Sequence, residues 1–504
     1  MSSTTTSGVT TTSMANGTTV TRLSGMASGI DTSSIVNSLV SVQKQSTVDP
    51  LTQKKQILEW EQGDYRTVNT KLLALQNSAF DLTLQGTFNA KKVSSANETA
   101  LTATASAAAV NGTYSIQVES LASGVSEEST PTVDSSYTYS GSDQSFTLTG
   151  KKGSATITVT SGDTISSIVG KINDQYSLTG IKATYDSGQN KFYLMTTDTG
   201  SNAKIEVTDT DNFLSSVLNV NTTSQTGKDA KIKFNGGSEM SFSSNQFTFN
   251  NISFNLKQSG QTTNVTVGTD TDAIYNKIKA FVDAYNNVLS DISGRLSETR
   301  YRDYKPLTDD QKKSMTDTQI TQWTDKAKSG LLRGDSLLIN ASSDIRSDAM
   351  GQVSGLSDST YTSLSSIGIN TENYEDNGKL VIDDDTLKAA LAANPEAVMN
   401  LFTTKGTGST DTMGIAQRVY ADAKSNISLI KDRAGSAADL YDSSNLGDEM
   451  RELDNRTTTA NDRLTAYETR LWAQYDAMET ALEKLNSQSS YITSLLGSNS
   501  NSSS

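Results

Sequence analysis

The side chains of this chain that could perform acid–base chemistry are carboxylates, because the 504-residue sequence contains neither histidine nor cysteine. Histidine is the usual general acid or base near neutral pH and cysteine is the thiol nucleophile, so histidine-dependent, thiol-dependent and zinc-dependent catalysis are disfavoured. Two carboxylates could still hydrolyse a glycoside, but no Asp/Glu pair stands at a readable spacing. We therefore expect no enzyme activity and no cofactor.

Two acidic motifs could instead bind a receptor or a cation. Residues 333–336 read Arg-Gly-Asp-Ser, a tetrapeptide that cell receptors recognise in many adhesive proteins, and residues 383–385 are three aspartates. Both motifs precede amphipathic segments, where an aspartate accepts hydrogen bonds from the free N–H groups of a first helical turn. We interpret Asp335 as a helix N-cap that no receptor can reach, and Asp384 or Asp385 as a second N-cap.

The composition also limits the partners. The chain carries 42 basic and 56 acidic residues, a net charge of −14, which argues against binding nucleic acid through its phosphates. We expect no membrane insertion, because no run of about 18 apolar residues occurs. The Ser/Thr-rich start lacks the basic patch and apolar run of a signal peptide, and its low hydrophobicity predicts a disordered arm.

Three apolar stripes predict long helices, which would position the acidic motifs and the other segments of the chain. The first repeats every seven residues from Leu51, the second alternates steps of four and three from Ile274 to Ile292, and the third runs from Leu464 to the C-terminus. The first two stripes could pair in an intramolecular bundle. The third has no other apolar helix near it in the sequence, so we expect it to pack against another molecule.

A shorter helix precedes the first stripe, with Asp31 or Thr32 as its N-cap. Its apolar face should carry Ile35, Leu39 and Val42, and Asp49-Pro50 should separate it from the next helix. The candidate self-assembly residues of the long helices are Leu51, Leu58, Tyr65, Leu72, Ile274, Ile278, Phe281, Tyr285, Leu464, Leu471, Tyr475, Met478, Leu482, Leu485 and Ile492.

Between residues 90 and 268 the apolar period changes to two, and Gly, Asn, Asp and Ser turns separate short strands, which predicts antiparallel sheets. One amphipathic helix over residues 165–172, with Asp163 as its N-cap, interrupts them. Further on, Asn377-Gly378 predicts a two-residue hairpin turn. The fold class is therefore α+β: an elongated, multidomain, hairpin-like chain with coiled-coil-like helical legs and inserted antiparallel β-rich head domains.

These patterns predict six parts. They are a disordered arm with a short terminal helix (1–48), an N-terminal leg helix (49–88), a β-rich head domain (89–135 with 225–268), an inserted outer head domain (136–224), a leg domain of helices and a hairpin (269–436), and a C-terminal assembly helix (437–504).

Four sequence blocks resemble the signature blocks of the flagellar filament cap family, also called hook-associated protein 2. The blocks are "SGMASGIDTSSIVNSLV", "DYKPLTDDQKKSMTDTQITQWTDKAKSGLLRGDSLL", "IGINTENYEDNGKLVIDDDTLKAALAANPEAVMNLF" and "TRLWAQYDAMETALEKLNSQSSYITSLL". In addition, residues 158–207 are similar to a strand–helix–strand module of flagellins and hook-associated proteins.

The resemblance implies a structural protein at the tip of the bacterial flagellum, secreted through the flagellar type III apparatus without a cleaved signal peptide. It implies a homo-oligomeric ring, a pentamer in preference to a hexamer, under which flagellin folds. Hook-associated junction proteins and an export chaperone would be further partners. Two alternatives remain open: another flagellar axial protein, either a junction protein or a flagellin-like one, and an adhesin whose head domains bind mucin or host surfaces.

Overall fold

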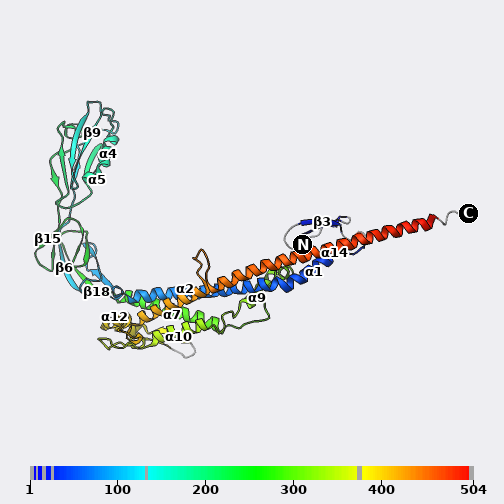
Figure 1. Cartoon of the computed structure of the whole chain (residues 1–504). Helices are drawn as coiled ribbons and strands as arrows, with labels where there is room; N and C mark the ends of the chain where they lie inside the picture. The colour runs from blue at the N-terminus through cyan, green and yellow to red at the C-terminus, as the bar shows by residue number, and fades with distance from the viewer. Residues whose placement is uncertain are drawn as a thin grey trace. The chain divides into compact units, whose positions relative to one another are not determined.

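The computed structural model describes residues 28–130, 134–371 and 377–498, with side chains to Leu495, and the backbone of three short strands nearer the N-terminus (Figure 1). It combines helices with antiparallel sheets, which confirms the predicted α+β class. No helix in the described part is long and apolar enough to cross a membrane.

The N-terminal tract differs from the expected disordered arm. Strands β1 (Thr5–Thr6), β2 (Val9–Ser13) and β3 (Thr19–Leu23) form a three-stranded antiparallel sheet in that order. Threonine and valine favour extended backbone, a preference that the low overall hydrophobicity hid. The other residues before Ser28 lie outside the described part of the chain.

The chain divides into two compact units, a helical unit of residues 1–84 and 275–504 and a β-rich unit of residues 85–274. The helical elements are α1 (Thr32–Thr47), α2 (Asp49–Thr83), α7 (Thr271–Ser297), α8 (Asp309–Lys312), α9 (Asp317–Lys328), α10 (Ser336–Met350), α11 (Asp384–Ala393), α12 (Pro395–Thr403), α13 (Ile415–Ala434) and α14 (Asn445–Ser498). Two 3-10 turns, η1 (Leu364–Ile367) and η3 (Thr410–Thr412), and a hairpin of β19 (Ile369–Thr371) and β20 (Leu380–Ile382) complete them.

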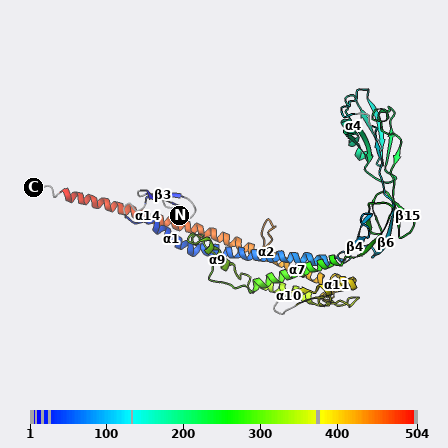
Figure 2. The same ribbon diagram turned by 180° about the vertical axis from the view of Figure 1, so that it is seen from behind.

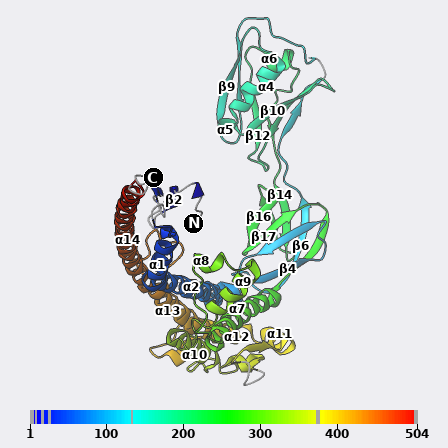
Figure 3. The same ribbon diagram turned by 90° about the vertical axis from the view of Figure 1, so that its right-hand side faces the viewer.

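Helix α2 lies between α7 and α14 (Figures 1 and 3). Its heptad stripe is buried from Leu58 onward, and α13 packs along α2. Ion pairs join α2 to α7 near both ends of the contact, Asp64 to Arg295 at 2.5 Å and Asp81 to Lys277 at 2.7 Å, and the two helices run side by side in Figure 2. The predicted pairing of the first two stripes is confirmed, whereas α13, which the sequence analysis did not identify, contributes much of the packing.

Two expected helix boundaries are found in the structure: Asp31 caps α1, and α2 begins at Asp49. Asn394 caps α12, with Pro395 at the first position of that helix. The three-aspartate motif is corrected by one residue, because Asp383 accepts the N–H of Thr386 and caps α11. No cluster of three or more possible ligands that could hold a metal occurs among the described residues, the three aspartates included.

The tetrapeptide motif starts a helix, as expected. Gly334 takes the left-handed conformation at φ +71°, and the Asp335 carboxylate caps α10 by accepting the N–H of Leu338 at 2.9 Å. Its second oxygen accepts the hydroxyl of Tyr65 on α2 at 2.6 Å. The carboxylate is therefore engaged on both sides and ties α10 to α2.

Asp335→Ala should lower the free energy of unfolding by about 0.5 to 2 kcal/mol for the lost cap alone, and by more because the buried Tyr65 loses its acceptor. Thermal melting checks this, with Asp325→Ala as an exposed control in the same unit. We also expect any adhesion of cells to the protein to be unchanged. Loss of adhesion by Asp335→Glu without a thermal effect would restore the receptor interpretation.

The β-rich unit alternates short strands and turns. Its elements are α3 (Gln85–Phe88), β4 (Lys91–Ser95), β5 (Leu101–Ala105), β6 (Gly112–Ser120), β7 (Ser126–Glu128), β8 (Gln144–Thr149), β9 (Ser154–Val159), α4 (Ile165–Asp174), α5 (Tyr176–Thr179), β10 (Ile181–Asp186), β11 (Lys191–Thr196), β12 (Lys204–Thr208), α6 (Phe213–Ser216), β13 (Gln225–Thr226), β14 (Ala230–Phe234), β15 (Glu239–Phe242), β16 (Gln246–Phe249), β17 (Ile252–Leu256) and β18 (Gln261–Thr269).

Two hydrophobic clusters hold this unit together. One lies between the sheets β15-β14-β6-β18-β4 and β16-β17-β5, and the other packs α4 and α6 on the sheets β13-β12-β8-β9 and β10-β11-β7. The second cluster includes Val125, which precedes the predicted domain boundary at residue 136. The six predicted domain boundaries otherwise stay predictions.

The N-cap of α4 is also corrected. Thr164, and not Asp163, accepts the N–H of Ser167. Asp163 is buried. Its carboxylate accepts hydrogen bonds from the ammonium group of Lys171 at 2.5 Å and from the N–H of Thr160 at 2.7 Å. Burial alone would raise the pKa of Asp163, but these donors hold it at about 2. The ionised carboxylate therefore joins α4, through Lys171, to the residues that precede the helix.

Helix α10 meets α13 through a pair of carboxyl groups, Asp348 and Asp422. Burial and the hydrogen bond to Asp422 raise the pKa of Asp348 to about 7 against its ordinary 3.8, and the Asp422 charge adds to this, while the buried Arg418 opposes it. A folded-state pKa that is raised favours the protonated form. This contribution to stability is therefore complete below pH 4 and is lost as the pH rises towards 7.

Asp348→Asn should flatten the pH dependence of unfolding between pH 4 and 8, because the amide keeps a hydrogen bond without gaining a charge. At pH 8 the variant should be more stable than the parent by on the order of 1 kcal/mol, a value discounted for partial exposure. Denaturant titrations at several pH values measure this, with Asp432→Asn as the exposed control on α13. An unchanged slope for Asp348→Asn would contradict the pairing.

Candidate assembly surface

Nine of the fifteen candidate self-assembly residues are buried inside the chain, which corrects their assignment. Each of these nine side chains is more than nine-tenths buried and leaves almost no surface for a second subunit, so they are core residues. Leu51, Tyr475, Met478 and Leu482 are half-buried, and only Leu485 and Ile492 are exposed. The buried nine are Leu58, Tyr65, Leu72, Ile274, Ile278, Phe281, Tyr285, Leu464 and Leu471.

The first part of the C-terminal stripe does have a partner within the chain, contrary to the expectation from sequence. Leu464, Leu471 and Trp472 of α14 form a hydrophobic cluster with Val36 and Val40 of α1, and Val48 completes it. The contact joins segments more than 400 residues apart, so no local pattern could reveal it. It makes α1 and α14 one packed pair.

The face of α1 that packs on α14 is not the apolar face that the sequence predicted. Val36 and Val40 face α14, whereas Ile35, Leu39 and Val42 stay 37%, 38% and 65% exposed. These three share a face by their spacing of four and three, as predicted, but that face is uncovered. A helix that is apolar on two sides has a second surface to bury.

The last turns of α14 extend beyond α1 and expose a second apolar row. Leu485 is 59%, Tyr491 66%, Ile492 55% and Leu495 50% exposed. Tyr491 and Leu495 were not among the predicted residues, although they continue the same apolar pattern to the end of the helix. We use the name terminal surface for the seven exposed residues Ile35, Leu39, Val42, Leu485, Tyr491, Ile492 and Leu495.

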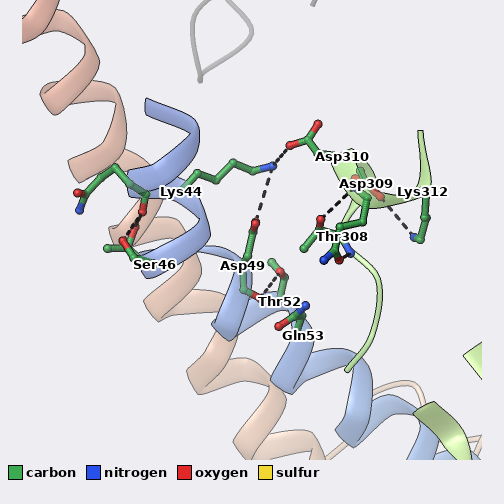
Figure 4. A network of polar contacts seen from close by, with 12 residues as sticks. Lys44, Ser46, Asp49, Thr52, Gln53, Thr308, Asp309, Asp310 and Lys312 are labelled. Carbon is green, nitrogen blue, oxygen red and sulfur yellow. Dashed lines mark hydrogen bonds and ion pairs between the residues drawn. The ribbon is translucent and has the colours of Figure 1, made fainter. Parts of the chain in front are cut away.

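A polar network fixes the start of α2 and the end of α1 against the segment that carries α8 (Figure 4). Lys44 lies 3.0 Å from the Asp310 carboxylate and 3.7 Å from that of Asp49, and Gln53 donates to the carbonyl of Pro306 at 2.7 Å. These contacts join the junction between α1 and α2 to residues 306–310.

Lys44 attracts both carboxylates of this network, but the two carboxylates repel each other. Hydrogen bonds from Lys313 and Lys44 hold the pKa of Asp310 at about 2. Burial lowers the pKa of Lys44, but Asp310 and Asp49 outweigh that effect and raise it. Burial raises the pKa of Asp49 in turn. The depressed pKa of Asp310 stabilises the fold above about pH 4, and this contribution is lost as the pH falls towards 2, so the ion pair of Asp310 with Lys44 persists at neutral pH.

Three family profiles match this chain. "Flagellar hook-associated protein 2 C-terminus" matches residues 227–487, "Flagellar hook-associated protein 2 N-terminus" matches residues 28–124, and "Flagellin hook IN motif" matches residues 145–199. The first profile alone spans more than half of the chain. The third falls in the β-rich unit, over the segment that resembles the module of flagellins.

Relatives align over nearly the whole length. The flagellar hook-associated protein 2 of Halalkalibacterium halodurans is 29% identical over 93% of this chain and 98% of its own, and that of Escherichia coli K12 is 28% identical over 95% and 98%. The crystal structure of the D1-D2-D3 domains of the flagellar cap protein FliD from Escherichia coli has a similar fold, with a TM-score of 0.55 over 72% of this chain and 96% of that one, at 24% identity. By these matches the chain belongs to the flagellar hook-associated protein 2 family.

Proposed function

We propose that this chain forms the cap at the distal tip of a bacterial flagellar filament, where it promotes the folding and insertion of exported flagellin and prevents its loss. The observation that carries the proposal is the terminal surface, an uncovered apolar face on the paired ends of a chain from this family. Large exposed apolar rows on soluble proteins mark contacts with other molecules. The role is structural and involves no catalysis.

The partners follow from the same surface. Its two rows, one on α1 and one on the end of α14, suit the helical ends of further copies and of flagellin, because amphipathic helices bury such rows against one another. We propose a homo-oligomeric ring, with five copies favoured over six, that meets flagellin and the hook-associated junction proteins. The chain would reach the tip through the type III export apparatus with an export chaperone, without losing a signal peptide.

Expression in a flagellated strain that lacks its own cap protein tests the proposal. Restored filaments, with the chain located at their tips by immunogold electron microscopy and less flagellin monomer in the medium, are the expected result. Labelling along the filament or only at its base would indicate a flagellin-like or junction protein instead. If the strain releases as much flagellin as it does without the chain, and no filament tips are labelled, the proposal is contradicted.

A further inference from the structure

The segment of residues 299–329, which carries α8 and α9, leaves the helical unit after α7, lies beside α2 and returns before α10 (Figure 3). We use the name strap for this segment. Only Pro306 and Ala327 are buried among its residues. A segment that buries so little apolar surface loses few contacts when it leaves the molecule, so the strap should open more easily than α7 and α10 on either side of it.

The two ends of the strap are fastened to each other. Ser329 Oγ donates to the carbonyl of Thr299 at 2.6 Å, and the N–H of Gly330 donates to the Glu298 carboxylate at 2.9 Å. Gly330 has φ +67°, and a Cβ there would lie 2.9 Å from the carbonyl oxygen of Glu298, so this position requires glycine. None of these contacts involves α1 or α2. This neck can therefore stay closed when the rest of the strap moves.

The strap also has contacts of its own between the neck and its far end. Trp323 Nε1 donates to the carbonyl of Lys305 at 2.8 Å, and the centre of the indole lies 4.6 Å from that of the Tyr304 ring. Thr308 and Thr316 begin α8 and α9 with complete capping boxes. Because these contacts are internal to the strap, they survive when it leaves α2.

The far end of the strap meets the junction of α1 and α2 through polar contacts (Figure 4). Lys44 of α1 lies 3.0 Å from the Asp310 carboxylate, and the two side chains are 34% and 52% exposed. Gln53 of α2 donates to the carbonyl of Pro306 at 2.7 Å. Dissolved ions screen an attraction between charges as exposed as these. Salt should therefore weaken this attachment, whereas it does not weaken the apolar core of α2, α7 and α13.

We propose that the strap opens as a unit at its far end, with its neck closed, and that its closure covers the junction of α1 and α2. A cavity of about 200 Å³ lies between the two, lined by Val48 and Gln56 of the junction and by Leu307 of the strap. Val42 of the terminal surface is within about two helical turns of Val48. The state of the strap thus determines how much of this end of α1 another molecule can reach. The opening is a property of a single copy and does not depend on the proposed cap.

Hydrogen exchange followed by mass spectrometry tests the opening on the full chain. Helix α9 has 12 residues, and an isolated helix of that length is marginal in water, so its amides should exchange when the strap is open. Raising the salt from about 0.1 M to about 1 M shortens the Debye length from about 10 Å to about 3 Å and should speed exchange in α9 about fivefold or more. Exchange in α7 and α10 should not change. No change in α9, or an equal change in all three helices, would overturn the proposal.

Two lysines that pair with the same carboxylate provide matched variants. Lys44 reaches Asp310 from α1, whereas Lys313 reaches it at 2.7 Å from within the strap. At low salt, Lys44→Gln should bring exchange in α9 close to the rate of the parent at high salt. Lys313→Gln removes the same charge without removing a contact to α1, so its α9 should exchange as in the parent. Equal exchange in the two variants would contradict the proposed attachment.

A covalent lock separates opening from a general effect of salt. Because the chain contains no cysteine, Lys44→Cys with Asp310→Cys can be joined specifically by a short bismaleimide. Exchange in α9 of the joined protein should be slow at both salt concentrations, and in the unjoined double variant it should be fast at both. If exchange in α9 still accelerates with salt after joining, it does not arise from opening at this end, and the proposal is overturned.

Discussion

Two charges on the exposed end of α14, Leu485→Asp with Ile492→Asp, should abolish filament formation while leaving the main melting transition unchanged. Both side chains are more than half exposed and touch no internal core, so a charge there costs the folded chain little. In the assembly, each substitution removes the roughly 1.5 to 3 kcal/mol that burial of the apolar side chain contributes. A symmetric ring loses this stabilisation in every subunit at once. Cells carrying the variant should make no filaments and release flagellin monomer into the medium.

A matched control separates loss of the apolar row from added charge. Ser487→Asp with Ser494→Asp has the same spacing of seven on the same turns of α14 and should give normal filaments. Short or absent filaments in this control would mean that charge alone disrupts the end of the helix. Normal filaments in the leucine and isoleucine variant would mean that the terminal surface is not used in assembly.

The sequence does not show where along α14 the core ends and the exposed surface begins. From the periodicity alone, Leu471 and Leu485 are equivalent members of one stripe. In the structure Leu471 is 8% exposed against Val36 and Val40, whereas Leu485 lies beyond the end of α1. A charge at Leu471 would therefore disturb the chain itself. The boundary between core and surface along α14 depends on where another segment stops, which no local pattern encodes.

The features that the sequence predicted correctly are those that depend on interactions between residues close together in the chain. The seven-residue apolar repeat of α2, the caps Asp31 and Asp335, and the left-handed pair Asn377-Gly378 at φ +53° and +86° each depend on a few neighbouring residues. The errors arose from contacts between distant segments. Helix α13 carries mixed apolar and charged residues, and its partner stripe on α2 is what makes it a core helix.

The candidate site was predictable in kind but less so in detail. An amphipathic C-terminus without enough internal cover is visible in the sequence, and the end of α14 is uncovered. The face of α1 could not be decided, because Ile35, Leu39 and Val42 make as good a stripe as Val36 and Val40 do. Tertiary packing selected the valines for α14. The attachment of the strap to α1 and α2 was not predicted, since it joins segments that are far apart in the sequence.

Removing the indole of Trp472 should release α1 from α14 without unfolding the rest of the helical unit. Trp472 is 1% exposed, in the cluster that contains Val36, Val40 and Leu464, and a buried Trp→Ala change costs about 3 to 5 kcal/mol. The bundle of α2, α7 and α13 has its own buried residues, so the loss should fall on the terminal pair. Amide hydrogen exchange in α1 should accelerate roughly 100-fold or more, with the main transition retained.

Trp60→Ala, which removes the same ring from a half-buried position on α2, should leave exchange in α1 unchanged. If α1 in the Trp472 variant stays as protected as in the parent, the pairing of the two chain ends does not depend on this cluster, and the terminal surface would then rest on a different contact.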